Sequence, residues 1–232
     1  MKNFVMILIC LSLILGIACT IKEFYVDSYD TSAAAEIDDE YRHLHKEIDN
    51  SSQPWNLLLV NDYNPMPEKT EITLVETKYG ERIDERIMPY ITEMLSDAEK
   101  SGFTPEITSG YRSRESQQEI FDSRKKEYRA LGHTKKEAES LANEYVAKPG
   151  YSEHETGLAV DINSSDGDSR EFYMWLEANC HKYGFIIRYP AGKEKITGIE
   201  YEPWHLRYVG ENTATYLQQN NLTLEEYLVG KQ

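Results

Sequence analysis

Residues 152–161 read Ser-Glu-His-Glu-Thr-Gly-Leu-Ala-Val-Asp, a polar turn that runs into an apolar stretch. Gly157 allows a sharp turn here, because glycine adopts backbone angles that other residues avoid. The apolar residues after it predict a buried strand over 160–162 that carries Asp161. An unpaired buried carboxylate is costly, so Asp161 needs a partner. A metal ion is one such partner, and an arginine or a helix N-terminus are the commoner ones.

A second segment, Glu202-Pro203-Trp204-His205, supplies another histidine. Catalytic zinc sites use three protein ligands drawn from thiolate, imidazole and carboxylate, and they keep a fourth position open. No cysteine lies near either segment, so His154, Asp161 and His205 form the natural candidate set. Taken singly, each histidine is more often a surface or core residue, and the spacing alone leaves that alternative open.

Glu202 precedes His205 by three residues. A carboxylate beside a zinc site can take the proton from a water that attacks a carbonyl group, and it can return that proton to a leaving amine. The pattern therefore makes Glu202 the candidate general base of such a site.

Local signals around these segments predict an α+β domain, in which helices surround a small antiparallel sheet. Helical spacing of apolar residues, glycine stops and a Thr134-x-x-Glu137 capping box predict the helices. The pattern places them over 84–100, with Pro89 starting or kinking the first, and over 114–129, 134–147 and 169–183, with a short last helix from Thr223. Short apolar or alternating runs predict strands over 57–60, 106–108, 160–162, 185–189 and 202–208.

The N-terminus has the pattern of a targeting segment. Lys2 precedes an apolar stretch that runs from Phe4 to Cys19, which is typical of a signal peptide or an uncleaved membrane anchor. A lipoprotein signal ending at Cys19 is a third alternative, which Gly16 weakens because leucine usually occupies that place. We expect residues 1–20 to be this signal or anchor, 21–53 a polar linker and 54–232 the folded domain.

The composition argues against one class of partner and against stabilisation by disulfide bonds. The chain has 40 acidic and 25 basic residues and a net charge of −15, which argues against a nucleic-acid partner. Cys180 is the only cysteine outside the N-terminal apolar stretch. The folded part therefore cannot contain an internal disulfide and depends on its core.

Three motifs in this order resemble those of the VanY-type D-alanyl-D-alanine carboxypeptidases and the related L,D-carboxypeptidases of peptidoglycan. The resemblance runs from about Leu57 to Leu228. The motifs are Ser109-Gly110-Tyr111-Arg112-Ser113, Ser152-x-His154-x-x-Gly157-x-Ala159-x-Asp161 and Glu202-Pro203-Trp204-His205.

The resemblance implies a zinc metallopeptidase that removes the C-terminal D-alanine from cell-wall stem peptides, with a fold shared with hedgehog signalling domains. It implies one Zn²⁺ per chain, bound by His154, Asp161 and His205, and it makes Glu202 the general base and acid.

The resemblance also suggests residues that contact the substrate. Arg112 matches the motif arginine that contacts substrate and stabilises the oxyanion, and the alternative for it is a structural salt bridge. Gln117 and Ser152 are candidates for holding the substrate's terminal carboxylate. They could equally be a helix-surface residue and a loop-capping residue.

Several alternatives follow for the activity. Cleavage of D-Ala-D-Ala is favoured, and an L,D-carboxypeptidase acting on tetrapeptide stems is the alternative. A catalytically inactive peptidoglycan-binding module is the alternative from another class, although all four metal and base residues survive. We expect an extracytoplasmic monomer that is membrane-anchored or secreted. A part in glycopeptide resistance would depend on neighbouring genes.

Overall fold

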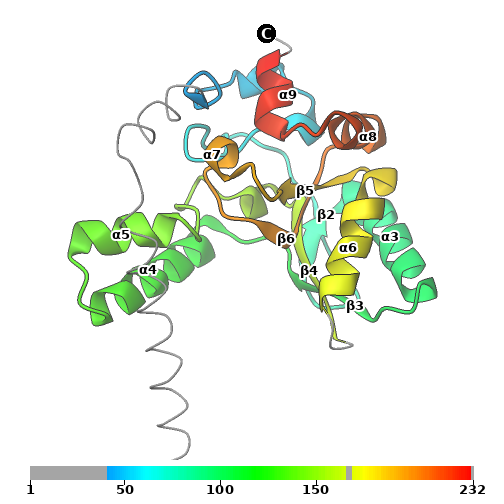
Figure 1. The fold of residues 1–232 in the computed structure, drawn as a ribbon, viewed down its shortest axis with the longest axis horizontal. Helices are drawn as coiled ribbons and strands as arrows, with labels where there is room; N and C mark the ends of the chain where they lie inside the picture. Colours follow the sequence, from blue (N-terminus) through cyan, green and yellow to red (C-terminus); the bar gives the residue numbers. More distant parts are fainter. Residues whose placement is uncertain (1–40, 166–168, 231–232) are drawn as a thin grey trace, which may run out of the picture. The chain divides into compact units, whose positions relative to one another are not determined.

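Four antiparallel strands form the central sheet, in the order β3-β4-β6-β5 (Figure 1). The structure is a computed structural model that describes residues 41–165 and 169–230. A separate pair of short strands, β1 and β2, precedes the sheet in the chain. The α+β class with a small antiparallel sheet is thus confirmed. The strands are β1 Leu74–Glu76, β2 Arg82–Asp84, β3 Pro105–Ser109, β4 Ala159–Ser164, β5 Phe185–Tyr189 and β6 Glu202–Tyr208.

Helices lie on both sides of this sheet. In Figure 1, α3 and α6 lie together on one side, and the α4–α5 pair lies on the other. The helices are α3 Met88–Lys100, α4 Arg114–Ala130, α5 Lys135–Asn143, α6 Ser169–Asn179, α7 Glu194–Thr197, α8 Glu211–Asn220 and α9 Leu224–Gly230. Single 3₁₀ turns are η1 Asn50–Ser52, η2 Trp55–Leu57, η3 Glu85–Ile87, η4 Glu153–Thr156 and η5 Cys180–Tyr183.

The core consists of two clusters of buried apolar side chains. The larger one joins α3 and α6 to the sheet through residues such as Met94, Phe172 and Leu206. The smaller one joins α8 and α9 to the segment before the sheet, with Leu59 and Leu228 among its members. Apolar packing in two clusters therefore fixes the helices and the segment before the sheet.

Most of the predicted elements are confirmed, with shifted ends. The helix expected over 84–100 begins at Met88, with Pro89 in its first turn, where the missing N–H of proline costs nothing. The Thr134 capping box is present, but α5 ends at Asn143, short of the expected 147. The helix from Ser169 changes to a 3₁₀ turn at Cys180 before it ends at Gly184.

The strand expected over 57–60 does not form, and that prediction is wrong. The run is buried, but its backbone bonds to side chains instead of to a neighbouring strand. The side chain of Asn50 bonds both the N–H and the C=O of Leu59 at 2.9 Å, and Arg207 donates to the carbonyl of Leu58. An apolar run indicates burial, whereas a strand also needs a partner strand with a free edge.

The structure leaves the N-terminal predictions untested. Residues 1–40 lie outside the described residues, and with them the expected signal or anchor and most of the expected linker. None of the helices among the described residues is long and apolar enough to cross a bilayer. The described residues from Leu44 onward belong to one compact unit, and Leu44 and Ile48 are already buried in it. Packing thus begins ahead of residue 54, where we expect the folded domain to start.

Candidate active site

Strand pairing brings two of the predicted metal ligands together. In the register of β4 and β6, Asp161 lies directly opposite His205. The Asp161 Oδ1 atom is 3.1 Å from His205 Nδ1. Both side chains come from the central strands β4 and β6, each of which pairs with a neighbouring strand on both sides.

The third predicted ligand reaches the same point from a tight turn. His154 lies in η4, which ends at Gly157 with a φ of 69°, and this confirms the sharp turn expected there. The carbonyl of Gly110 accepts a hydrogen bond of 2.7 Å from His154 Nδ1. With its proton on Nδ1, the ring carries a lone pair on Nε2, which a metal ion could use. This Nε2 atom lies 3.5 Å from Asp161 Oδ2.

The three side chains fit a zinc ion. Each offers one donor atom, and these atoms all lie within 4.8 Å of one another. Zinc–ligand bonds of 2.0–2.2 Å in a tetrahedron place the donors about 3.4 Å apart. His154 Nε2 lies 3.5 Å from Asp161 Oδ2, and His205 Nδ1 lies 3.1 Å from the other carboxylate oxygen, Oδ1. Asp161 Oδ1 is buried and has no hydrogen-bond partner among the described residues. A cation at this point would give that oxygen a partner.

Electrostatics in the cluster depend on the carboxylates. Burial raises the pKa of Asp161, but the two histidines lower it by more than burial raises it, so the net shift is downward. Burial lowers the pKa of His205, but the carboxylates of Asp161 and Glu153 raise it more, to about 9. The pKa of His154 is lowered, chiefly by burial. A metal must therefore displace a proton from His205, as is usual when imidazole ligands bind metals.

Glu202 stands beside the donor atoms. Its Oε2 is 3.6 Å from His205 Nδ1, on the side of the ring that faces Asp161. Burial raises the pKa of Glu202 from its ordinary value, which increases its affinity for a proton. The arrangement suits a group that accepts and returns a proton next to a metal-activated water.

Arg112 approaches the same atoms from the loop after β3. Its Nη2 lies 3.2 Å from His154 Nε2 and 3.3 Å from Asp161 Oδ2. Two further bonds, from Nε and Nη2, go to Ser109 Oγ. Burial lowers its pKa, but an arginine remains charged in proteins. The guanidinium thus puts a fixed positive charge at the edge of the ligand cluster.

Gln117 and Ser152 lie in the same cleft as the ligands. Gln117, on α4, is 1% exposed. Its carbonyl oxygen accepts from Arg112 at 3.2 Å, and its amide donates to the carbonyl of Ala147 at 2.7 Å. Ser152 is also buried, directly before η4. A contact of either residue with a substrate stays a prediction.

Sequence reasoning missed other residues of the cleft. Tyr189 ends β5, and the centroid of its ring is 4.9 Å from that of His205. Its position at the end of an expected strand was the only signal available. Glu153, between two predicted site residues, is completely buried as a side chain, and an acidic residue inside a motif gives no sign of its partners. The remaining lining residues are Tyr145, Val146, Ala147, Ile199 and Trp204.

The chain is similar to known proteins over most of its length. The family model VanY, described as D-alanyl-D-alanine carboxypeptidase, matches residues 80–211, more than half of the chain. A D-alanyl-D-alanine carboxypeptidase of Enterococcus faecalis is 48% identical over 178 residues, which cover 76% of this chain and 66% of that protein. The chain thus spans about two thirds of the length of this relative.

Solved structures resemble the fold over most of its length. The vancomycin resistance D,D-pentapeptidase VanY, as a mutant in complex with Zn(II), is 48% identical with a TM-score of 0.72, covering 75% of this chain and 99% of that one. VanYB in complex with D-alanine-D-alanine is 47% identical with a TM-score of 0.74, covering 77% and 100%. The LD-carboxypeptidase LdcB is 37% identical with a TM-score of 0.64, covering 79% and 94%.

Proposed function

Since this chain belongs to the VanY family of D-alanyl-D-alanine carboxypeptidases, we propose that it is a zinc-dependent carboxypeptidase that removes the C-terminal D-alanine from peptidoglycan stem peptides. The observation that carries the proposal is the convergence of His154, Asp161 and His205 within 4.8 Å, with Glu202 beside them. Cleavage of D-Ala-D-Ala is favoured, because the D,D-enzymes VanY and VanYB are more similar to the chain than LdcB is.

His154, Asp161 and His205 would hold the zinc ion through Nε2, the carboxylate and Nδ1. When bound, zinc supplies Lewis-acid activation of water and of the peptide carbonyl. The Glu202 carboxylate takes the proton of the attacking water. It then gives this proton to the amine of the departing D-alanine, which would otherwise leave as an unstable anion.

Arg112 supplies positive charge where negative charge develops. The carbonyl oxygen becomes an oxyanion when water adds to it, and a preorganised guanidinium favours that charge. Ser109 and Gln117 orient the guanidinium through the hydrogen bonds described above. We propose that Ser152 and Gln117 contact the terminal carboxylate of the peptide, because both line the same cleft as Arg112.

The same proposal covers the chain's location. We infer that residues 1–20 export the protein or anchor it, and that residues 21–53 link this segment to a monomeric catalytic domain over 54–232, with the end of the linker, from Leu44, packed onto that domain. The apolar stretch after Lys2 supports export, and a cell-wall substrate requires it. Membrane fractionation combined with protease accessibility in whole cells tests this, and a protein protected inside the cytoplasm would contradict it.

The activity is tested with synthetic stem peptides and mass spectrometry. The purified chain should release one D-alanine from a pentapeptide ending in D-Ala-D-Ala. A chelator should abolish release, and added Zn²⁺ should restore it. Release from a tetrapeptide alone would make the enzyme an L,D-carboxypeptidase. Peptide binding without any product would make it a binding module.

Glu202→Ala separates catalysis from metal binding. We expect the variant to lose about 10²–10⁴-fold in kcat, because its base is gone, while it still binds about one Zn²⁺ per chain. Metal analysis and peptide turnover on the same preparation give both values. Turnover equal to the parent's would refute the role of Glu202.

A further inference from the structure

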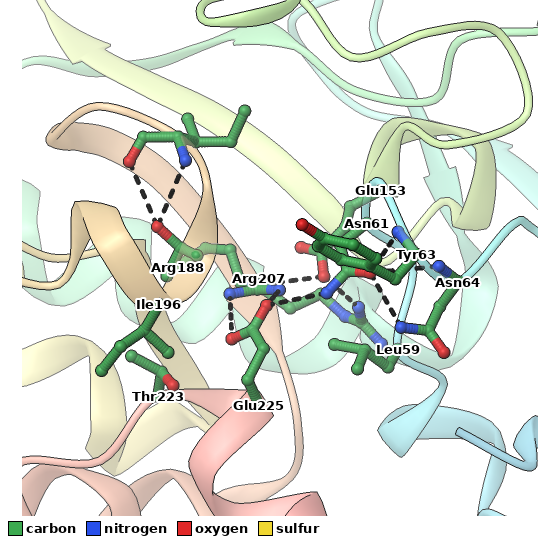
Figure 2. Close-up of polar contacts among 12 residues, drawn as sticks. Leu59, Asn61, Tyr63, Asn64, Glu153, Arg188, Ile196, Arg207, Thr223 and Glu225 are labelled. Atoms are coloured by element: carbon green, nitrogen blue, oxygen red, sulfur yellow. Dashed lines mark hydrogen bonds and ion pairs between the residues drawn. The ribbon is translucent and has the colours of Figure 1, made fainter. Parts of the chain in front are cut away.

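Glu153 carries a buried charge that the proposed mechanism does not use. It belongs to a cluster of four charged side chains, Glu153, Arg188, Arg207 and Glu225, which are all completely buried. Figure 2 shows the two carboxylates gathered around the two guanidinium groups. The two positive and two negative charges balance, as a buried ionic cluster requires.

The two oxygens of Glu153 have different surroundings. Oε1 accepts hydrogen bonds from Arg188 Nε at 2.8 Å and from Arg207 Nη1 at 2.7 Å. Oε2 is buried and has no hydrogen-bond partner among the described residues. His205 Nε2 lies 3.9 Å from this oxygen. The arginines therefore hold the carboxylate in place and leave one oxygen directed at the histidine.

The two ring nitrogens of His205 also have different surroundings. Its Nδ1 faces Asp161 and Glu202, the side on which the proposed metal lies. Its Nε2 is buried, and it too lacks a hydrogen-bond partner in the part of the chain that the structure describes. An imidazole that binds metal through Nδ1 carries its proton on Nε2. Nε2, the nitrogen that would carry this proton, lies 3.9 Å from Glu153 Oε2.

We propose that Glu153 is a positioning residue for His205, which accepts a hydrogen bond from Nε2–H and thereby fixes the tautomer that leaves Nδ1 free for zinc. This inference rests on the proposed function, because it assigns His205 as a ligand. A movement of about 1 Å closes the 3.9 Å gap to an ordinary hydrogen bond. Hydrogen bonds of this kind orient ligating histidines and raise their basicity.

The arginines make Glu153 suitable for this role. Arg188 Nε and Arg207 Nη1 hold one oxygen of its carboxylate at 2.8 and 2.7 Å, so the negative charge is neutralised in this buried place. Arg188 is in turn held by a bidentate pair with Glu225, at 2.6 and 3.0 Å. Helix α9, which carries Glu225, thus helps to neutralise the buried charge of Arg188.

The test compares Glu153→Gln with Glu225→Gln. Both substitutions remove one buried charge from the same cluster, but only the first changes the group that faces His205. We expect Glu153→Gln to weaken Zn²⁺ affinity about 10–100-fold, measured by competition with a chromophoric chelator. We expect Glu225→Gln to lower thermal stability and to keep Zn²⁺ affinity within about threefold of the parent.

The outcomes are distinguishable. Failure of the parent chain to bind Zn²⁺ would overturn the proposed function itself. Unchanged affinity in Glu153→Gln, or an equal loss in both variants, would overturn the role of Glu153 alone. If Glu153→Gln does not fold, ¹⁵N NMR of the zinc-loaded parent decides, since the proposal requires a proton on His205 Nε2 and none on Nδ1. An unprotonated Nε2 would refute it.

Discussion

At the scale of the single residue, two glycines with nearly the same backbone angles lie in different surroundings. Gly184, between η5 and β5, has a φ of 81°, and Gly192, in the loop after β5, has a φ of 79°. A Cβ atom on Gly184 would lie 2.7 Å from the ring of Tyr208 and 3.0 Å from the backbone of Glu211. A Cβ on Gly192 would meet no atom within 4 Å. Comparing substitutions at these two glycines therefore separates the cost of backbone strain from the cost of steric contact.

Alanine substitutions make this a prediction. Gly192→Ala should lower the free energy of unfolding by about 1–2 kcal/mol, the cost of a left-handed non-glycine residue. Gly184→Ala should lower it by an additional 1–3 kcal/mol or so, because the Tyr208 ring must shift in a packed region. Urea unfolding of both variants measures the difference. Equal losses would show that the space around Gly184 is not restrictive.

At the scale of elements, α4 is tied to the loop that closes one side of the cleft. Gln117 on α4 donates to the carbonyl of Ala147 and accepts from Arg112. The loop residues Tyr145, Val146 and Ala147 line the cleft, and Gln117 holds this loop through its hydrogen bond to Ala147. One side chain thus holds both a wall of the cleft and the guanidinium that we propose acts on the substrate.

Gln117→Leu tests this connection. The substitution keeps the approximate size of the side chain and removes both hydrogen bonds, so the loop and Arg112 lose a fixed position. We expect KM for the peptide to rise about tenfold, which corresponds to one or two ordinary hydrogen bonds, with Zn²⁺ affinity unchanged. Gln118→Leu, at the exposed neighbouring position, is the control and should behave like the parent. A loss of zinc in Gln117→Leu would contradict a role confined to the cleft.

At the scale of the whole molecule, buried charges link stability to pH. The pKa of Glu153 is lower in the folded chain than its ordinary value of 4.5. A lowered pKa means that the ionised carboxylate stabilises the fold at pH values above about 4.5, and that this contribution is lost as the pH falls below that value. Arg188 joins this charge to Glu225 on the C-terminal helix, and Arg207 joins it to the carbonyl of Leu58 in the segment before the sheet.

The prediction concerns the metal-free chain. After chelation, its Tm should fall as the pH is lowered from 6 towards 3, because the unfolded chain then binds more protons than the folded one. Glu153→Gln should have a lower Tm at pH 6 and a shallower fall, since that proton uptake is removed. Glu68→Gln, at an exposed position, should follow the parent curve. A slope in Glu153→Gln equal to the parent's would mean that other carboxyl groups cause the acid lability.

The candidate metal ligands could be named from the sequence because each lies in a short local motif, and the order of the three motifs favoured a metal site that the spacing alone left open. His154, Asp161 and His205 lie in short motifs, and strands 185–189 and 202–208 have the predicted bounds. Alternation, capping and glycine stops depend on neighbours within a few residues. That is why these elements, and the candidate zinc ligands that they carry, could be predicted from the amino-acid sequence.

The long-range partners were decided by the tertiary structure alone. The run 57–60 is buried but forms no strand, because Asn50 and Arg207 bond its backbone. Glu153 meets Arg188 and Arg207 across more than 30 positions of the chain. The sequence by itself determined which groups could bind a metal and where many of the helices and strands lie. Only the folded chain decided which buried charges neutralise one another and which oxygen faces His205, because those energies depend on distances between segments that no local pattern encodes.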